Sequence, residues 1–382
     1  DHHRAHLQAA WFTSGFPDAL VLSLDGIGDG CSGAVALGGP DGLREIDRFS
    51  GRDSLGLLYE EATRLLSMRE LEDEGKVMSL ASHADLDDKA RHVLSDLVEV
   101  RTDSGRLRLK VGARPYKRLR EILWKWGPER FAAAVQALAE EKVLAIVEAG
   151  LALTGAKRLA VAGGVFANVK VNRRIRERFF ADTDGLWVFP HMGDGGLALG
   201  AAVAAPCALD PYLGPGVTAA AAAAEARGRG LAVREVGLDD VARRLERGDA
   251  IGWINGRMEL GPRALGARSI LARPDDRRIR DKLNLVQKRR VFYQPFCPTL
   301  LASEARRSLA GYDGRPERWM TSLYGVDASG ESRLAGVTGP DNSCRPQILP
   351  ELPATPEERL FADLAAAAAR RTGIGGILNT SF

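Results

Sequence analysis

The chain has 382 residues, more than the usual single-domain length of about 100–200 residues, so we expect two domains. Lys and Arg total 53 and Asp and Glu total 50, and this balance argues against nucleic acid as the main partner. No apolar run reaches the length of a membrane span, no signal pattern opens the chain, and the four cysteines are too scattered for a disulfide framework, so we expect a cytoplasmic protein without a membrane partner.

The first half of the chain predicts an α/β domain over residues 1–205. Its first residues look helical. An apolar strand from Ala19 then delivers Asp25 to a glycine-rich turn, and a second strand begins at Cys31. Helical patterns dominate from about Leu55 to Leu153.

Two further strands in this domain lead into glycine pairs and then helices. The strand from Arg158 runs into Gly163 and Gly164, and an amphipathic helix follows Asn168. The strand from Val188 leads to Asp194 and its flanking glycines, before a helix of small residues expected from Leu197 to Ala205. Glycines let the backbone approach a ligand closely and helix N-termini attract anions, so ligands are expected at these strand ends.

A Pro-, Ala- and Gly-rich stretch over 206–230 is interpreted as a linker. A second domain over 231–382 is expected to open with a strand from Leu231 to Val236, a helix from Asp239 to Arg247 and a strand from Ala250 to Ile254. The chain ends at Phe382 in a strand-like stretch and begins without Met, so we expect a fragment of a longer protein.

Four residues of the first domain are candidate metal ligands. His2 and His6 lie four residues apart, which on a helix places both rings on one face about 5–6 Å apart. Asp25 and Asp194 each end an apolar strand, and two imidazoles with two carboxylates suit iron(II), manganese or zinc. A solvated basic helix start and two turn-capping aspartates are the alternative interpretation.

Cationic residues concentrate in the second domain. The stretch from Asn255 to Ser269 contains three arginines and a glutamate among glycines, and Arg263 is the preferred candidate for binding phosphate or carboxylate. Lys288 and Arg290 precede an aromatic, proline-rich segment, and Arg345, Asn379 and Ser381 lie in later strand-like stretches. Solvated surface arginines remain the alternative.

Taken together, these motifs resemble those of the O-carbamoyltransferase family of nodulation-factor and antibiotic carbamoyltransferases. The matching stretches lie in family order along nearly the whole chain: His2 to His6, Leu24 to Gly26, Ala162 to Asn168, Gly193 to Gly196, Gly256 to Ser269, Lys288 to Pro298 and Leu378 to Phe382. The glycine- and arginine-rich string around Arg263 is the most specific of them.

The resemblance implies an actin/hsp70/sugar-kinase-like domain, incomplete at its N-terminus, followed by a YrdC-like domain. The second domain would make carbamoyl-adenylate from carbamoyl phosphate and ATP with Mg, and the first would transfer the carbamoyl group to a hydroxyl of a small-molecule acceptor at an iron(II) site. His2, His6, Asp25 and Asp194 would hold the metal. The implied substrate and nucleotide contacts are Gly163, Gly164, Asn168, Arg263, Lys288, Arg290, Arg345, Asn379 and Ser381, with Arg263 and Lys288 in catalytic roles.

Two departures from the family pattern matter. The N-terminal third of the family is missing, and Gln294 stands where relatives commonly carry Arg.

The acceptor and the oligomeric state, including a homodimer, are left open. The alternatives are a sugar-type kinase of the same superfold and a factor for tRNA threonylcarbamoylation or hydrogenase maturation; the near-neutral charge and the absence of cysteine quartets count against the latter.

Overall fold

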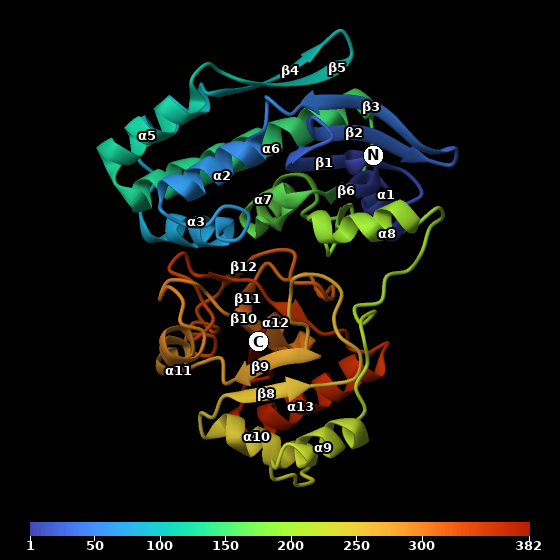
Figure 1. Ribbon diagram of the computed structural model, residues 1–382, viewed down its shortest axis with the longest axis vertical. Coiled ribbons are helices and arrows are strands. Elements are labelled where there is room, and N and C mark those ends of the chain that lie inside the picture. Colours follow the sequence, from blue (N-terminus) through green and yellow to red (C-terminus); the bar gives the residue numbers. More distant parts are fainter. The chain divides into compact units, whose positions relative to one another are not determined.

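The computed structural model describes residues 1–382 and divides into two compact units, unit 1 from Asp1 to Leu209 and unit 2 from Asp210 to Phe382 (Figure 1). Each unit contains a mixed sheet with helices packed against it, so the expected α/β class is confirmed. The narrower expectation of an actin/hsp70-like part followed by a YrdC-like part stays a prediction. None of the helices combines the length and the apolar character needed to cross a membrane.

Unit 1 begins with a helix, three strands and a helical region. Its elements are α1 (His2–Ser14), β1 (Ala19–Gly28), β2 (Cys31–Gly39), β3 (Gly42–Ser50), α2 (Leu55–Leu65), α3 (Glu74–Leu80), α4 (Asp88–Ser95), β4 (Val98–Asp103), β5 (Arg106–Val111), α5 (Pro115–Trp126), α6 (Pro128–Thr154), β6 (Leu159–Ala162), α7 (Val169–Phe179), β7 (Leu186–Val188) and α8 (Leu197–Ala202). Short 3-10 turns over Gly164–Ala167 and Asp194–Gly196 follow β6 and β7.

The sheet of unit 1 has the strand order β3-β2-β1-β6-β7. The first three strands are antiparallel, whereas β1, β6 and β7 are parallel, with Leu22 of β1 opposite Val161 of β6. Parallel strands end at the same edge of a sheet. The turns after β6 and β7 therefore lie at the edge of the sheet where β1 delivers Asp25.

Alternate residues of β1 face two different hydrophobic cores. Leu20, Leu22 and Leu24 pack into the larger core, which also contains residues of α2, α6 and α7. Ala19 and Val21 pack into the smaller core beneath α1. This period of two places the odd-numbered Asp25 on the face of the sheet that α1 covers.

The stretch between β3 and β6 is less uniformly helical than its sequence predicts. The helices are present, but β4 and β5 form an antiparallel hairpin in which Val98 pairs with Val111. The helix of small residues after Asp194 ends at Ala202 rather than Ala205. The hairpin alternates charged side chains with buried Leu107 and Leu109, a strand pattern that the surrounding helical periodicity obscured.

Unit 2 contains one larger sheet, one small sheet and five helices. Its elements are α9 (Ala219–Gly228), α10 (Leu238–Glu246), β8 (Ile251–Ile254), β9 (Arg268–Ala272), α11 (Arg277–Lys282), a π-helical turn (Leu283–Gln287), β10 (Cys297–Leu300), α12 (Ala302–Ser308), β11 (Leu309–Ala310), β12 (Tyr324–Val326), β13 (Ser343–Cys344), β14 (Gln347–Ile348), α13 (Pro356–Thr372) and β15 (Gly376–Thr380). The larger sheet has the order β14-β10-β15-β9-β8 and the small one the order β11-β12-β13.

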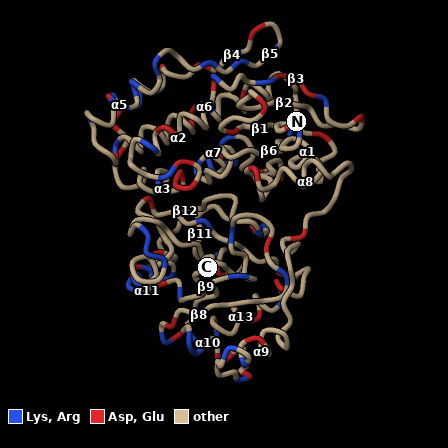
Figure 2. The backbone as a smooth tube through the Cα atoms, in the orientation of Figure 1, with Lys and Arg blue, Asp and Glu red and all other residues tan.

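The larger sheet of unit 2 also separates two cores. Leu271 and Ile377 pack with α10 and α13 on one side, whereas Ala272, Leu300 and Leu378 pack with the small sheet on the other. Lys and Arg concentrate along α11, while both signs of charge alternate along much of the remaining chain (Figure 2).

Two expectations for the start of unit 2 need comment. The predicted strand from Leu231 to Val236 is wrong for this structure, because the segment forms no strand and is exposed throughout. The expected linker over 206–230 stays a prediction, although part of it packs in unit 2: Tyr212 is buried and its hydroxyl donates to the carbonyl of Leu265 at 3.0 Å. The alanine run forms the exposed helix α9.

Candidate functional site

The four predicted metal ligands lie together in unit 1. His2 and His6 occupy successive turns of α1, Asp25 lies on β1, and Asp194 begins the turn after β7. The two Nε2 atoms, one carboxylate oxygen of Asp25 and one of Asp194 all lie within 4.8 Å of one another. The helix spacing and the parallel strand ends therefore bring these side chains to one point, as the sequence predicted.

Asp25 is the centre of this cluster. Its Oδ2 lies 3.1 Å from Nε2 of His2 and 3.0 Å from Nε2 of His6. Asp194 completes the cluster, since its Oδ1 lies 3.6 Å from both of these nitrogens. The side chain of His6 is fully buried while that of Asp194 is 70% exposed, so the cluster is open on one side only.

The donor set fits a divalent transition metal. Oδ1 of Asp25 accepts the backbone N–H groups of Gly26 and Gly164, at 2.9 and 3.1 Å, which leaves Oδ2 for the cluster. Burial by itself would raise the pKa of Asp25, but hydrogen bonds to His6 and His2 hold it far below its usual range. A carboxylate that stays ionised beside two imidazole nitrogens is a suitable ligand set for iron(II), manganese or zinc.

A neighbouring histidine fixes the helix that carries the cluster. His3 is buried, and its two ring nitrogens lie 2.8 Å from Oγ of Ser23 and 3.0 Å from the carbonyl oxygen of Cys31. These contacts join α1 to β1 and β2 directly beside the candidate ligands. The sequence analysis did not single out His3, although its place between His2 and His6 was a signal.

The glycines after β6 hold the backbone against Asp25. Gly163 has a φ of 101°, and a Cβ there would lie 2.1 Å from the carbonyl oxygen of Leu24. A Cβ on Gly164 would lie 2.8 Å from Oδ1 of Asp25. Only glycine permits this approach of the backbone to β1, and the predicted contact of Gly163 and Gly164 with a ligand stays a prediction.

Asn168 is engaged within the protein. Its Oδ1 accepts the backbone N–H of Val171, which caps α7, and also accepts a hydrogen bond from Nε2 of Gln136. Its Nδ2 donates to Oε1 of the same Gln136 at 2.9 Å. These contacts explain Asn168 as a helix cap tied to α6, and its predicted role in binding a ligand stays a prediction.

The candidate anion-binding residues of unit 2 gather at one end of the larger sheet. There β8 and β15 end, and β9, β10 and β14 begin, because their pairing is antiparallel except between β10 and β14. Arg263 lies in the loop from β8 to β9, Arg290 precedes β10, and Arg345 precedes β14. The topology therefore brings together three arginines that are far apart in sequence.

Cys297 lies among these arginines, and the sequence analysis did not identify it. Nε and Nη2 of Arg345 lie 3.2 and 3.0 Å from its Sγ. Burial and the charge of Arg345 lower the pKa of Arg263. Burial likewise lowers the pKa of Arg290 to about 10, with Cys297 opposing this effect and Arg345 adding to it. None of these three arginines forms an ion pair with a carboxylate in the structure.

The glutamate of the arginine-rich loop has a different task. Oε1 of Glu259 accepts three backbone N–H groups, from Leu265, Ala267 and Arg268, at 2.7 to 2.9 Å. Glu259 is buried, so it organises the loop that carries Arg263 instead of neutralising the arginine. A buried carboxylate with three N–H donors is well satisfied.

Several buried polar atoms at this end of the sheet have no hydrogen-bond partner. They are Nε of Arg263, Nη2 of Arg290, Oε1 of Gln294 and Oδ1 of Asn379. Nδ2 of Asn379 is fixed by the carbonyl of Ala264 and the hydroxyl of Thr299. Because buried polar atoms are rarely left unpaired, these atoms are available to water or to a polar ligand.

Lys288 and Ser381 form a separate pair near the cluster. Nζ of Lys288 donates to the backbone carbonyl of Ser381 at 2.5 Å. Burial and the neighbouring Arg290 lower the pKa of Lys288. The structure thus brings together every cationic residue predicted for this site, while their roles in catalysis and nucleotide binding stay predictions.

Comparison with known protein families gives matches over most of the chain. Residues 1–203 match the family model described as carbamoyltransferase N-terminus, and residues 242–382 match that described as carbamoyltransferase C-terminus. The two matches cover the candidate metal ligands and the arginine cluster respectively.

Curated relatives agree with these matches. The nodulation protein NolNO of Sinorhizobium fredii is 33% identical over 408 residues, covering 100% of this chain and 58% of the relative. The nodulation protein NolO of Bradyrhizobium diazoefficiens is 32% identical, covering 100% of this chain and 72% of the relative. Nodulation protein U of Azorhizobium caulinodans is 32% identical over 59% of this chain. The chain therefore belongs to the carbamoyltransferase family.

Proposed function

We propose that this chain carries the two chemical parts of an ATP-dependent O-carbamoyltransferase. Unit 2 forms carbamoyl-adenylate from carbamoyl phosphate, ATP and water, releasing phosphate and pyrophosphate. Unit 1 transfers the carbamoyl group from the adenylate to a hydroxyl of a sugar or natural-product acceptor in the cytoplasm, releasing AMP. The observation that carries this proposal is the cluster of partly buried arginines in unit 2, which lacks a carboxylate partner and therefore calls for an anionic substrate.

The arginines of unit 2 suit chemistry on phosphates. A guanidinium binds phosphate through two parallel hydrogen bonds and keeps its charge at neutral pH. Arg263, Arg290 and Arg345 would hold the phosphates and offset the charge that develops as they transfer. Glu259 keeps the loop that carries Arg263 in place, so the cations are positioned before substrate arrives.

The histidine and aspartate cluster of unit 1 would hold iron(II) or another divalent metal. Its ligands would be His2, His6, Asp25 and Asp194. When bound, such a metal supplies a Lewis acid that polarises a carbonyl or anchors a phosphate. The backbone N–H groups of Gly26 and Gly164 orient Asp25, and His3 anchors the helix that presents the two histidines.

The family membership supports the transfer of a carbamoyl group. We further propose that unit 1 has the actin/hsp70-like fold and unit 2 the YrdC-like fold. The chain spans 58% of the length of NolNO.

The test is pyrophosphate release from ATP and Mg²⁺ by this chain, with and without carbamoyl phosphate. The proposal expects release that depends on carbamoyl phosphate and is lost in Arg263→Met. Arg243→Met is the control, because Arg243 is a surface residue paired with Asp240. Release that ignores carbamoyl phosphate would instead favour a kinase-like reaction and would overturn the proposal.

A further inference from the structure

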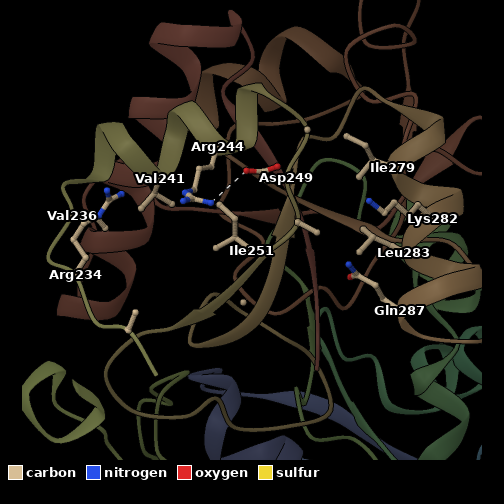
Figure 3. Close-up of a pocket in the computed structure, with 14 residues that line it drawn as sticks. Arg234, Val236, Val241, Arg244, Asp249, Ile251, Ile279, Lys282, Leu283 and Gln287 are labelled. Carbon is tan, nitrogen blue, oxygen red and sulfur yellow. Dashed lines mark ion pairs between the residues drawn. The ribbon is translucent and has the colours of Figure 1, made fainter. Parts of the chain in front are cut away.

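A cavity of about 710 Å³ in unit 2 lies apart from the residues assigned to the proposed reaction (Figure 3). One wall runs from Gly248 into the start of β8, as far as Gly252, and a second is the end of α11 with the π-helical turn, including Leu283. The exposed segment from Leu231 to Val236, the strap, contributes Ala232, Arg234 and Val236 to a third. The cavity therefore separates an edge strand from a segment with a strand-like sequence.

The edge of β8 that faces away from β9 has unused backbone hydrogen-bonding groups. The backbone N–H of Asn255 donates to the carbonyl of Ala267. In an antiparallel ladder every second residue bonds to the same neighbour, so the residues of β8 that bond to β9 are those in step with Asn255. Gly252 and Ile254 consequently direct their N–H and C=O groups to the free edge. The side chain of Ile254 is 57% exposed, and an uncovered edge of this kind is a template for another strand.

The strap has the side-chain alternation of a strand but forms no strand hydrogen bonds. Its alternate residues Ala232, Arg234 and Val236 line the cavity, which is the period of an extended chain. Between Ala232 and Val236 no backbone group forms a hydrogen bond with another backbone group. Leu231 is 60% exposed and Val233 is 38% exposed, so closure would remove apolar surface from water.

The order of elements allows the strap to pair with β8. The strap is followed by α10 and then by β8, which is a strand–helix–strand unit. Such a unit places its two strands side by side and parallel, with a helical crossover. α10 already packs with α13 on one side of the sheet, as a crossover helix requires. Gly230 and Gly237 flank the strap and provide points of flexion.

We propose that the strap closes on the free edge of β8 as a sixth, parallel strand and that this closure fills the cavity. β8 leads directly into the loop that carries Glu259 and Arg263, so closure would also restrict the motion of β8 and of the start of this loop. The strap is thus a conformational device of unit 2. This inference does not depend on the proposed reaction.

The test is amide hydrogen exchange of Gly252 and Ile254 in the intact chain. Closure predicts exchange about 100-fold slower than in an unstructured peptide. Val233→Pro removes an N–H and fixes φ, so it should return these amides to rapid exchange, whereas Val233→Ala keeps the backbone and should leave them protected.

Two results would overturn the proposal. One is rapid exchange at Gly252 and Ile254 in the unmodified chain, which would mean that the edge stays open. The other is protection that appears only as the protein concentration rises, since that would mean strand exchange between two copies. Protection independent of concentration and lost in Val233→Pro alone supports the proposal.

Discussion

The candidate metal-ligand cluster of unit 1 and the arginine cluster of unit 2 differ in how their charges are balanced. In unit 1 an ionised Asp25 lies against two imidazoles and two backbone N–H groups, so the protein itself supplies the partners of the charge. In unit 2 three partly buried arginines lie together beside a thiol, and burial first, then the charge of Arg345, lowers the pKa values of Arg263 and Arg290. The first cluster contains a carboxylate together with its hydrogen-bond partners, whereas the arginines of the second have no carboxylate partner in the structure.

The backbone supports these two clusters differently. Unit 1 relies on glycine, because Gly163 and Gly164 let the chain touch β1. Unit 2 relies on the buried side chain of Glu259, which accepts hydrogen bonds from three backbone N–H groups of its loop. Substitutions that disturb the backbone should therefore destabilise unit 1 most. Substitutions that remove a charge should affect ligand binding by unit 2 more than its folding.

The largest expected effect is that of Gly163→Ala in unit 1. The new Cβ would lie 2.1 Å from the carbonyl of Leu24 at a φ of 101°, and such strain should lower the free energy of unfolding by about 3 kcal/mol or more. Gly193→Ala is the matched control, because Gly193 has no atom within 4 Å of its Cβ position. Urea denaturation of both variants measures the difference; equal stabilities would refute the role given to glycine.

Asp25→Asn tests whether the cluster of unit 1 is a metal site. The amide keeps the size of the side chain but removes the charge that faces His2 and His6, so affinity for a divalent metal should fall by about 100-fold. Metal content and titration with Co²⁺ measure this. Asp29→Asn is the control, since Asp29 is exposed and accepts only a backbone N–H of His2 in this region. Undiminished metal affinity in Asp25→Asn would contradict the assignment.

The sequence predicted the metal-ligand cluster because each of its residues sits in a strong local pattern. A helical spacing of four joins His2 to His6, and parallel strands bring Asp25 and Asp194 to one edge of the sheet. The arginine cluster was predicted as a set of residues, but its convergence depends on the order of strands in the sheet. The sequence does not encode that order locally, and for the same reason Cys297 was missed.

Other errors have local causes. The β4–β5 hairpin was hidden because charged residues alternate along it within a helical region. The strap was predicted as a strand from its alternating pattern, yet a strand also needs a partner, and in the structure the strap has none. Asn168, a ligand contact implied by the family resemblance, caps the following helix in the structure, and its contact with a ligand stays a prediction.

Arg263→Met tests the charge imbalance of unit 2. Loss of one guanidinium should weaken binding of inorganic phosphate by about tenfold. The substitution should also raise the free energy of unfolding by about 1 kcal/mol in the absence of phosphate. The reason is that it removes a largely desolvated charge that Arg345 repels and replaces it with an apolar side chain of similar length. Calorimetric titration and thermal denaturation measure the two effects. Arg243→Met should change neither, and destabilisation by Arg263→Met would mean that the arginine has a partner in the unliganded protein.

The smallest expected effect concerns an acid beside the metal-ligand cluster. Burial first, and then the charges of Glu74, Asp25 and Glu70, raise the pKa of Glu60 to about 7. An acid with a raised folded pKa keeps its proton when the unfolded chain has already released it, so stability should fall as pH rises from about 4.5 to about 7 and stay lower above that.

Because Glu60 is half exposed, solvent screening reduces this cost to about 1 kcal/mol. Glu60→Gln should therefore be more stable than the unmodified chain at pH 8 and equal to it at pH 4, as measured by urea denaturation of the metal-free protein. A cation bound to Asp25 would offset the repulsion, so loading with metal should narrow the difference at pH 8. An unchanged difference at pH 8 would show that the charge of Asp25 does not affect Glu60. Glu60 would then not belong with the charges that the cluster of unit 1 balances.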